Sequence, residues 1–477
     1  MAGRRRTWAA VVAAGLWLSA AGTAPLPGAE VPRSAEAAAL LDEGLRHMGG
    51  RERLAGITRV RFDMMTMWQR TSFDDVPYPD GPSYEHHLDV RDYTLPAWRN
   101  TRELGFSAGA RTLVNVVRDS VAVTDLGQGF RPLSVAYVDE RRELFAYTPD
   151  RLMLWAREAA DLAAAGDTAV AGVPHARVRA TVNGIPMTLY LRASDGLPSF
   201  VAFRRGHPND FGLVPWGDMA VEVWYSRWRT FPDGVSLPTQ WDVRRAGAPY
   251  KRMTVLGAAF NPDFAADSFA VGPEERAAYL ASPAVLPMHD LALDSARVLE
   301  GAWTETRTFG SAAGAILLGD RWLLLEAGQA PLSTERALEW LERTTGKPVA
   351  AAVVGSTRGL HGGITALMDR GVPVTVGPAV GRLAPAALDG YGRRGARLDV
   401  VEAGRWIALA GDSVRVEPLD LPDVRGALVV WWPARRWLYV ADALTPLDLE
   451  LALEHADGRG WAVERVGTAR GLVQPRP

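Results

Sequence analysis

Four side chains in the last third of the chain have the types that acid–base or metal chemistry requires: Glu326, His361, Asp423 and Asp442. Two neighbouring carboxyl groups can hold different pKa values and divide the roles of general acid and general base between them. A histidine can join them as a base or as a metal ligand. The sequence therefore offers a carboxylate cluster in this region as one hypothesis for a site.

Other chemical motifs are weak or missing. His86 and His87 are neighbours in a strand-like run, so we expect their side chains to point to opposite faces, where they cannot share a metal. The serine of GSAAG stands in the second place, which is not the G-x-S-x-G pattern of a nucleophile. The chain has no cysteine, which excludes disulfides, thiolate metal sites and a cysteine nucleophile.

The composition and the N-terminus indicate an exported globular protein. Of the 477 residues 48% are hydrophobic and 23% charged, and the net charge of −2 gives no basic footprint for nucleic acid. Three arginines and the short apolar run WAAVVAAGLWLSAAGTA predict a signal peptide over residues 1–29, and an anchor helix is the alternative. No later apolar run is long enough to span a bilayer, so we expect a periplasmic or secreted protein that is not transmembrane after cleavage.

The elements that position these residues fall into two regions. In 30–272, Ser34 caps a helix and Ile57 to Val271 reads as strands with Asn-Gly and Asp-Gly turns, interrupted by one helix, PDRLMLWAREAADLAAAGD. This predicts an α+β domain with a curved antiparallel sheet, a half-barrel with helices on one face. A proline-containing linker, 273–305, leads to a C-terminal α/β region, 306–477.

The N-terminal region resembles the periplasmic outer-membrane lipoprotein carrier family. The resemblance rests on a first helix ending in Gly-Gly and on the order of LYLRASDGLPSFVAF, VWYSRWRTFPDGVSLPTQWDVRR and LGAAFNPDFAADSFAV. In that family the sheet and its helices enclose an apolar cavity for acyl chains, so the resemblance implies an apolar small molecule or lipid as the ligand. The alternative is that the many tryptophans of this region only fill its core.

The C-terminal region resembles the metallo-β-lactamase-fold hydrolases, which have an αββα architecture. It shares a strand GAILLGDRWLLLEAG, a helix STERALEWLERTTGKP, a strand AAVV and a loop that ends in Gly-Gly. The family carries its metal motif H-x-H-x-D-H in that loop. The runs LPDVRGALVVWWPARRWLYVADALTP and VERVGTARGLV resemble the segments that supply its remaining ligands.

The resemblance implies that the metal ligands have been lost. The family ligand positions are occupied here by Gly355, Thr357, Gly359, Leu360, Asp423, Asp442 and Arg470. The loop is one residue short, and a gap before the glycines would place His361 at the last motif histidine. A hydrolytic zinc site needs about three protein ligands, so we expect no cofactor. Arg470 can form a structural ion pair with Asp442, which we favour over catalysis, and His361 is expected to be an ordinary loop histidine.

These observations favour an exported, non-catalytic protein that binds an apolar ligand or an envelope partner and carries a degenerate metallo-β-lactamase-like domain. The alternative is a metal-dependent hydrolase of that superfamily with a rearranged zinc site. A purely structural component of the cell envelope is the third hypothesis.

Overall fold

The computed structural model describes residues 34–476 with internal gaps. The gaps are 69–82, 107–108, 134, 207–217, 246, 266, 283–294, 300, 309–310, 329–330, 357–362, 391–392, 394, 423, 442, 444 and 469–473. The expected signal peptide lies outside the described residues. Within them, no helix is long and apolar enough to cross a membrane.

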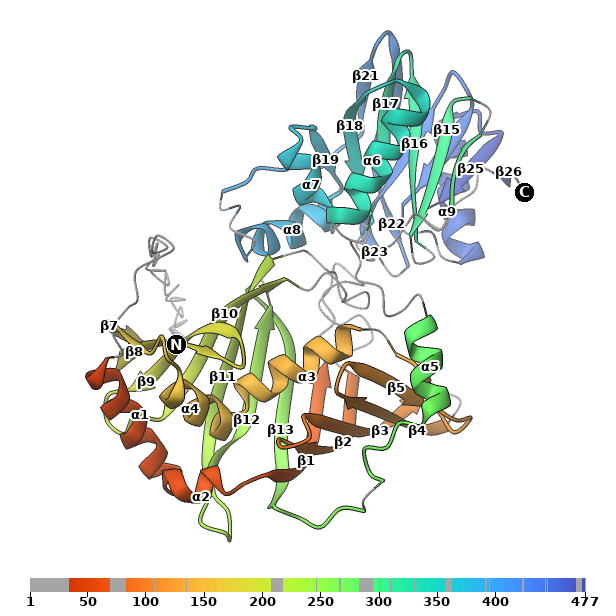
Figure 1. Cartoon of the computed structure of the whole chain (residues 1–477). Helices are drawn as coiled ribbons and strands as arrows, with labels where there is room; N and C mark the ends of the chain where they lie inside the picture. Colours follow the sequence, from red (N-terminus) through yellow and green to blue (C-terminus); the bar gives the residue numbers. More distant parts are fainter. Residues whose placement is uncertain are drawn as a thin grey trace, which may run out of the picture.

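The N-terminal region is built on one open antiparallel sheet, which Figure 1 shows below the C-terminal region. Its spatial order is β6-β5-β4-β3-β2-β1-β13-β12-β11-β10-β9-β8-β7. Two meanders, β1 to β6 and β7 to β13, are joined where β1 pairs with β13. The strands are β1 (Arg59–Trp68), β2 (Ser83–Asp92), β3 (Ala97–Phe106), β4 (Gly109–Arg118), β5 (Val121–Asp125), β6 (Arg131–Pro132), β7 (Ala163–Val170), β8 (Val173–Val182), β9 (Ile185–Arg192), β10 (Pro198–Gly206), β11 (Asp218–Thr230), β12 (Ser236–Arg245) and β13 (Ala248–Phe260).

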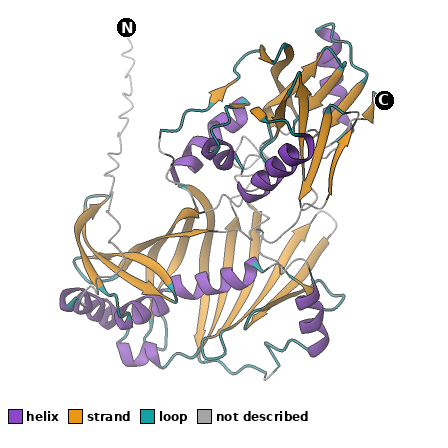
Figure 2. Cartoon of the chain, turned by 45° about the horizontal axis from the view of Figure 1, so that its top comes forward, coloured by secondary structure: helices purple, strands orange, loops and turns teal. Residues whose placement is uncertain are grey.

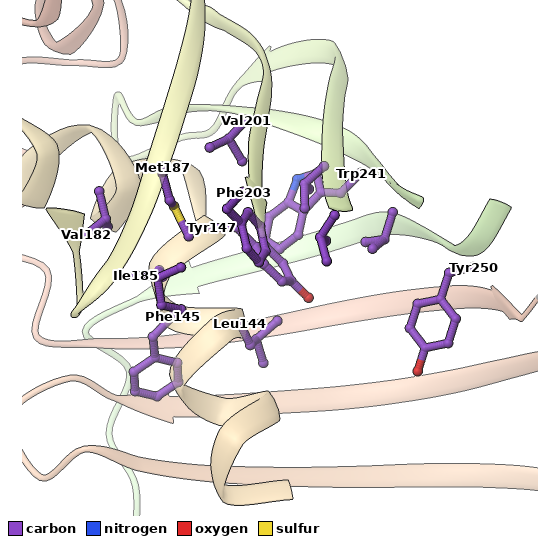
Figure 3. Packing of buried hydrophobic residues seen from close by; sticks show 14 of the residues in the cluster. Leu144, Phe145, Tyr147, Val182, Ile185, Met187, Val201, Phe203, Trp241 and Tyr250 are labelled. Carbon is purple, nitrogen blue, oxygen red and sulfur yellow. The ribbon is translucent and has the colours of Figure 1, made fainter. Parts of the chain in front are cut away.

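Helices cover one face of this sheet (Figure 2). They are α1 (Ala35–His47), α2 (Arg51–Ala55), α3 (Ala136–Tyr147) and α4 (Pro149–Glu158), and α5 (Pro273–Ala281) contacts β5 and β6. The second half of α3 packs on apolar side chains of β9, β10 and β12 (Figure 3). The mixed α and β composition and the large antiparallel sheet are as the sequence predicted, and the sheet does not close into a barrel.

Local sequence signals explain several boundaries. The Ser34 hydroxyl accepts a hydrogen bond from the Ala37 amide, as predicted for the cap of α1. Asn183 and Gly184 both have positive φ, 50° and 72°, which suits the tight turn between β8 and β9. The helix predicted over 149–167 ends early, because residues 163–170 form the strand β7.

The C-terminal region stacks two sheets between helices. The first sheet has the order β14-β15-β16-β17-β18-β19-β20 and the second β21-β22-β23-β24-β25-β26. One apolar cluster joins the two sheets, a second places α6, α7 and α8 on the first sheet, and a third places α9 on the second. The helices are α6 (Pro331–Thr345), α7 (Ile364–Asp369), α8 (Pro378–Gly390) and α9 (Pro446–Gly458).

The segment expected to be a linker contributes to this region. Besides α5, residues 273–305 contain β14 (Ser295–Leu299) and the start of β15 (Trp303–Thr308), which belong to the first sheet. The other strands are β16 (Ser311–Leu318), β17 (Arg321–Leu325), β18 (Val349–Val354), β19 (Val374–Val376), β20 (Asp399–Val400), β21 (Arg405–Leu409), β22 (Asp412–Leu421), β23 (Val424–Trp432), β24 (Trp437–Val440), β25 (Arg465–Thr468) and β26 (Gln474–Pro475).

Candidate functional site

Glu326 is the one member of the expected carboxylate cluster that the structure describes. It follows β17, has a positive φ of 71° and is fully buried. His361, Asp423 and Asp442 lie outside the described residues, as do Thr357, Gly359, Leu360 and Arg470. The geometry of the expected cluster can therefore be followed only at Glu326 and Gly355.

The Glu326 carboxylate holds the chain that follows β18. The Gly355 amide lies 3.2 Å from both carboxylate oxygens, and the Ser356 amide lies 3.0 Å from Oε2. The Tyr439 hydroxyl, from β24 of the facing sheet, lies 3.1 Å from Oε1. Backbone amides that donate to a buried carboxylate fix its position. Glu326 is thus a positioning residue that ties two strands of one sheet to the other sheet.

Close packing leaves no room for a side chain at position 355. A Cβ atom there would lie 2.7 Å from the Cβ atoms of Ala441 and Leu428. At Gly363, which follows the loop, a Cβ would overlap the Thr334 hydroxyl and the Ala327 carbonyl. A histidine at position 355 would therefore displace the core between the sheets.

The described residues do not fit a zinc ion. Glycine offers no donor atom at position 355, and Glu326 accepts hydrogen bonds from two amides and a phenol. Among the residues that the structure describes, no three histidine, aspartate or glutamate side chains are grouped closely enough to hold a metal. What Glu326 does in the described part of this site is anchor the backbone at residues 355 and 356.

A second concentration of polar side chains lies in the N-terminal sheet. Alternate residues of β2, namely Glu85, His87, Asp89 and Arg91, are all buried. Alternation places them on one face of the strand, and Arg91 reaches the Thr148 hydroxyl between α3 and α4, so this is the helix-covered face. His86 points to the other face and contacts Asp63 at 2.7 Å. The prediction that His86 and His87 face opposite ways is confirmed.

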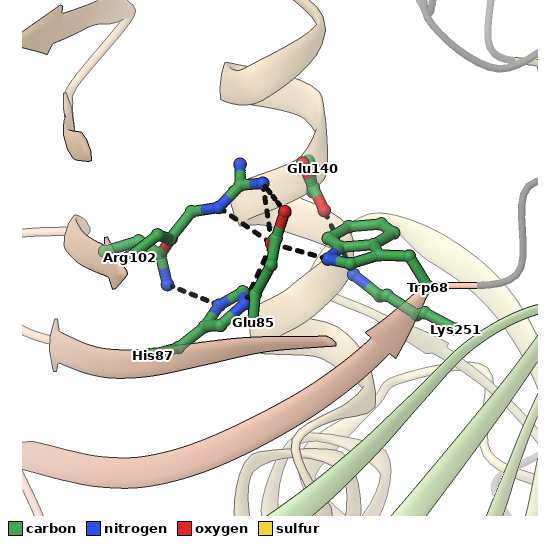
Figure 4. A network of polar contacts seen from close by, with 7 residues as sticks. Trp68, Glu85, His87, Arg102, Glu140 and Lys251 are labelled. Atoms are coloured by element: carbon green, nitrogen blue, oxygen red, sulfur yellow. Dashed lines mark hydrogen bonds and ion pairs between the residues drawn. The ribbon is translucent and has the colours of Figure 1, made fainter. Parts of the chain in front are cut away.

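Glu85 is the centre of the network in Figure 4. Its carboxylate receives the Trp68 indole N–H at 2.6 Å, the Arg102 guanidinium at 2.7 Å and His87 Nε2 at 3.1 Å. Burial alone would raise the pKa of Glu85, but hydrogen bonds and charges from His87 and Arg102 outweigh it and lower the pKa to about 2. Glu85 is therefore an ionised partner of Arg102 at neutral pH.

The network extends to α3 and to β3. Lys251 Nζ of β13 donates to Glu140 Oε1 of α3 at 3.0 Å and lies 5.3 Å from the centre of the Trp68 ring. Burial would raise the pKa of Glu140, but the positive charges of Lys251, Arg245 and Arg102 together outweigh it and the pKa is lowered. The Asn100 amide donates to His87 Nδ1 at 3.2 Å, so Nε2 is the nitrogen that donates to Glu85.

A half-open cavity of about 670 Å³ lies among β8, β9, β10 and β11. Most of its lining is apolar, and polar side chains stand among the apolar ones. This volume is within the range of small-molecule sites. The lining residues are Asp161, Ala163, Arg179, Ala180, Pro186, Met187, Thr188, Ala202, Phe203, Arg204, Ala220, Val221 and Glu222.

Sequence reasoning missed the polar network. Its signal is the run YEHHLDVRD, in which every second residue from Glu85 to Arg91 is ionisable. Such alternation usually marks the solvent side of a strand. Here the charged side is covered by a helix, which the pattern of one strand cannot reveal.

Comparison with known proteins gives a limited result. No family model matches the chain, and no curated protein matches it by sequence. Three solved structures illustrate what it is similar to. A metallo-beta-lactamase from Pontibacter korlensis is 19% identical, with 38% of this chain and 93% of that chain covered and a TM-score of 0.32.

Two further solved structures, TMB-1 and the metallo-beta-lactamase FIM-1, are similar to the same degree. TMB-1 is 14% identical, with 38% and 91% of the two chains covered and a TM-score of 0.31. FIM-1 from Pseudomonas aeruginosa, in a mono-zinc form, is 17% identical, with 39% and 92% covered and a TM-score of 0.32. At such TM-scores the likeness does not by itself assign a family or an activity to this chain.

Proposed function

We propose that this chain is an exported, non-catalytic protein that binds an apolar ligand in the cavity among β8 to β11. The observation that carries the proposal is the cavity itself, with Pro186, Ala202 and Ala220 among its apolar lining residues. Burial of apolar ligand surface against such side chains supplies the affinity, and the polar groups beside them orient the ligand. The resemblance of this region to lipoprotein carriers supports an acyl chain as the ligand.

In this proposal the C-terminal region is a metallo-β-lactamase-like domain that has lost its zinc ligands and serves as a scaffold or as a surface for an envelope partner. Support comes from its two sheets between helices and from the close packing around Gly355, which replaces a ligand by core contacts. Burial of the sheet faces, which needs no metal, holds such a core together.

Displacement of a fluorescent fatty acid tests the ligand. The probe is 11-(dansylamino)undecanoic acid, titrated into the purified protein and into two variants. Ala202→Phe places a ring in the cavity, whereas Ala176→Phe makes the same change on β8 outside the lining. We expect roughly tenfold weaker binding for Ala202→Phe, which corresponds to about 1.4 kcal/mol, and little change for Ala176→Phe. Equal affinities in all three proteins, or no saturable binding, would contradict the proposal.

Metal content separates the proposal from its alternative, a hydrolase with a rearranged site. Elemental mass spectrometry of the purified protein, before and after incubation with zinc, is expected to give far less than one ion per chain and no change in Tm. One tightly held ion per chain would favour the hydrolase. Deletion of residues 1–29 tests export, because the truncated protein is expected to stay in the cytoplasmic fraction.

A further inference from the structure

Three side chains continue the polar network along a row of the N-terminal sheet. Asn100 of β3 lies opposite Asn115 of β4, which in turn lies opposite Thr124 of β5. Their exposed fractions are 3%, 1% and 5%. The row therefore lies on the same covered face as His87, to which Asn100 is bonded, and α3 contacts β4 and β5.

Much of the hydrogen-bonding capacity of this row is unused. Within the described residues, neither the amide nitrogen nor the amide oxygen of Asn115 meets a partner, and the Thr124 hydroxyl also lacks one. The indole N–H of Trp98, two residues before Asn100 on β3, also meets no partner in the part of the chain that the structure describes. Buried polar groups in native proteins are satisfied with few exceptions, because an unmade bond is costly. Four such atoms on three neighbouring strands indicate a site for a ligand.

The charges around the row select the class of ligand. Glu85 is paired with Arg102, Lys251 with Glu140, and Asp89 with Arg91, at distances of 2.7, 3.0 and 2.7 Å. An ionic ligand would lose its hydration without gaining a counter-charge from these three pairs. A neutral group that both donates and accepts would satisfy Asn115, whose amide can form two parallel bonds with another amide.

We propose that the row Asn115–Thr124, with the Trp98 indole, binds a neutral amide-type group beneath α3. The site lies on β3, β4 and β5 and is separate from the cavity among β8 to β11, so it does not depend on the proposed apolar ligand. The first half of α3 is the less deeply buried side of this row, since residues 137–141 are half-buried whereas residues 143–147 are buried.

Three small molecules of nearly the same shape provide the test: acetamide, acetate and acetamidinium, which are neutral, anionic and cationic. The whole protein is labelled with ¹⁵N-asparagine, and the side-chain amide signal of Asn115 is assigned by its loss in Asn115→Leu. We expect a saturable shift of that signal with acetamide and none with either ion. We also expect Thr124→Val to weaken acetamide binding several-fold.

Thermal unfolding gives a second, independent readout. Asn115→Leu removes unsatisfied buried atoms and is expected to raise Tm by roughly 2–4 °C, and Thr124→Val is expected to raise it as well. Asn100→Leu is the matched control, because its amide is bonded to His87 and its loss is expected to lower Tm. Three results would each overturn the inference: no saturation with acetamide, equal shifts with all three molecules, or a lower Tm for both Asn115→Leu and Thr124→Val.

Discussion

Removal of the Glu326 carboxylate should destabilise the C-terminal region more than any neighbouring polar change. Glu326→Ala takes the acceptor away from the Gly355 amide, the Ser356 amide and the Tyr439 hydroxyl. All these groups stand around a side chain with no exposed surface. Water therefore cannot replace the missing acceptor without opening the contact between the two sheets.

The size of the effect follows from these contacts. A buried donor left without an acceptor costs about 1–3 kcal/mol. Loss of the acceptor for all three donors should therefore cost roughly 3–6 kcal/mol, because the surrounding structure can rearrange and recover part of the loss. Glu326→Gln keeps one acceptor oxygen and should cost about 2–3 kcal/mol. Tyr439→Phe deletes the hydrogen bond to Glu326 and should cost about 1 kcal/mol. The free energy of unfolding should thus fall in the order Tyr439→Phe, Glu326→Gln, Glu326→Ala, with the largest loss for the last.

Urea unfolding monitored by tryptophan fluorescence measures these losses, and hydrogen exchange of a peptide that covers residues 349–356 locates them. Glu417→Gln is the control, because Glu417 is also buried but its partners Arg415, His455 and Arg459 are partly exposed and can turn to water. It should cost about 1–2 kcal/mol, less than the loss expected for Glu326→Ala. If Glu326→Ala costs no more than Glu417→Gln, the anchoring role of Glu326 is wrong.

Three further changes test other parts of the fold. The pKa of Glu85 is lowered from 4.5 to about 2 in the folded protein, so its stabilising effect is complete above about pH 5 and is lost as the pH falls through 4.5 toward 2. The Tm of Glu85→Gln should therefore depend less on pH between 5 and 2 than that of the wild type. Arg91→Met leaves the buried Asp89 carboxylate without its ion-pair partner and should lower the free energy of unfolding, measured with denaturant, by about 3–5 kcal/mol. Adding Asp89→Leu to the same chain should largely restore that free energy. Gly355→Ala forces a Cβ against Leu428 and should lower the free energy of unfolding by about 1–3 kcal/mol, measured by calorimetry.

The sequence predicted the elements whose signals are local. The hydroxyl of Ser34 marks the start of α1, and Asn183-Gly184 marks a hairpin, because cap and turn conformations depend on a few adjacent residues. The C-terminal part of the predicted helix over 149–167 failed for a tertiary reason. Its alanines favour a helix, but residues 163–170 pair with β8 as the edge strand β7.

The polar side of the N-terminal sheet could not be predicted in the same way. AYVDERRELFAY, which forms α3, lacks a continuous apolar stripe, and the side chains of β2 on the helix-covered face are polar. Each pattern taken alone indicates exposure to solvent, and the two bury each other. At the candidate site, the sequence shows that Gly355 has no side-chain donor, whereas the tight packing of Gly355 against Ala441 and Leu428 can be seen only in the three-dimensional structure.

The pairing of β1 with β13 dictates when the N-terminal region can finish folding. Val60 of β1 pairs with Phe260 of β13, so the two meanders can join into one sheet only after β13 has been made. Each meander can form from its own hairpins. The pairing of β1 with β13 is slower, because it closes the long loop of chain between them at an entropic cost. Until then β1 presents an open edge that invites pairing with another chain. A nascent chain that stops short of Phe260 therefore holds two half-sheets with exposed edges.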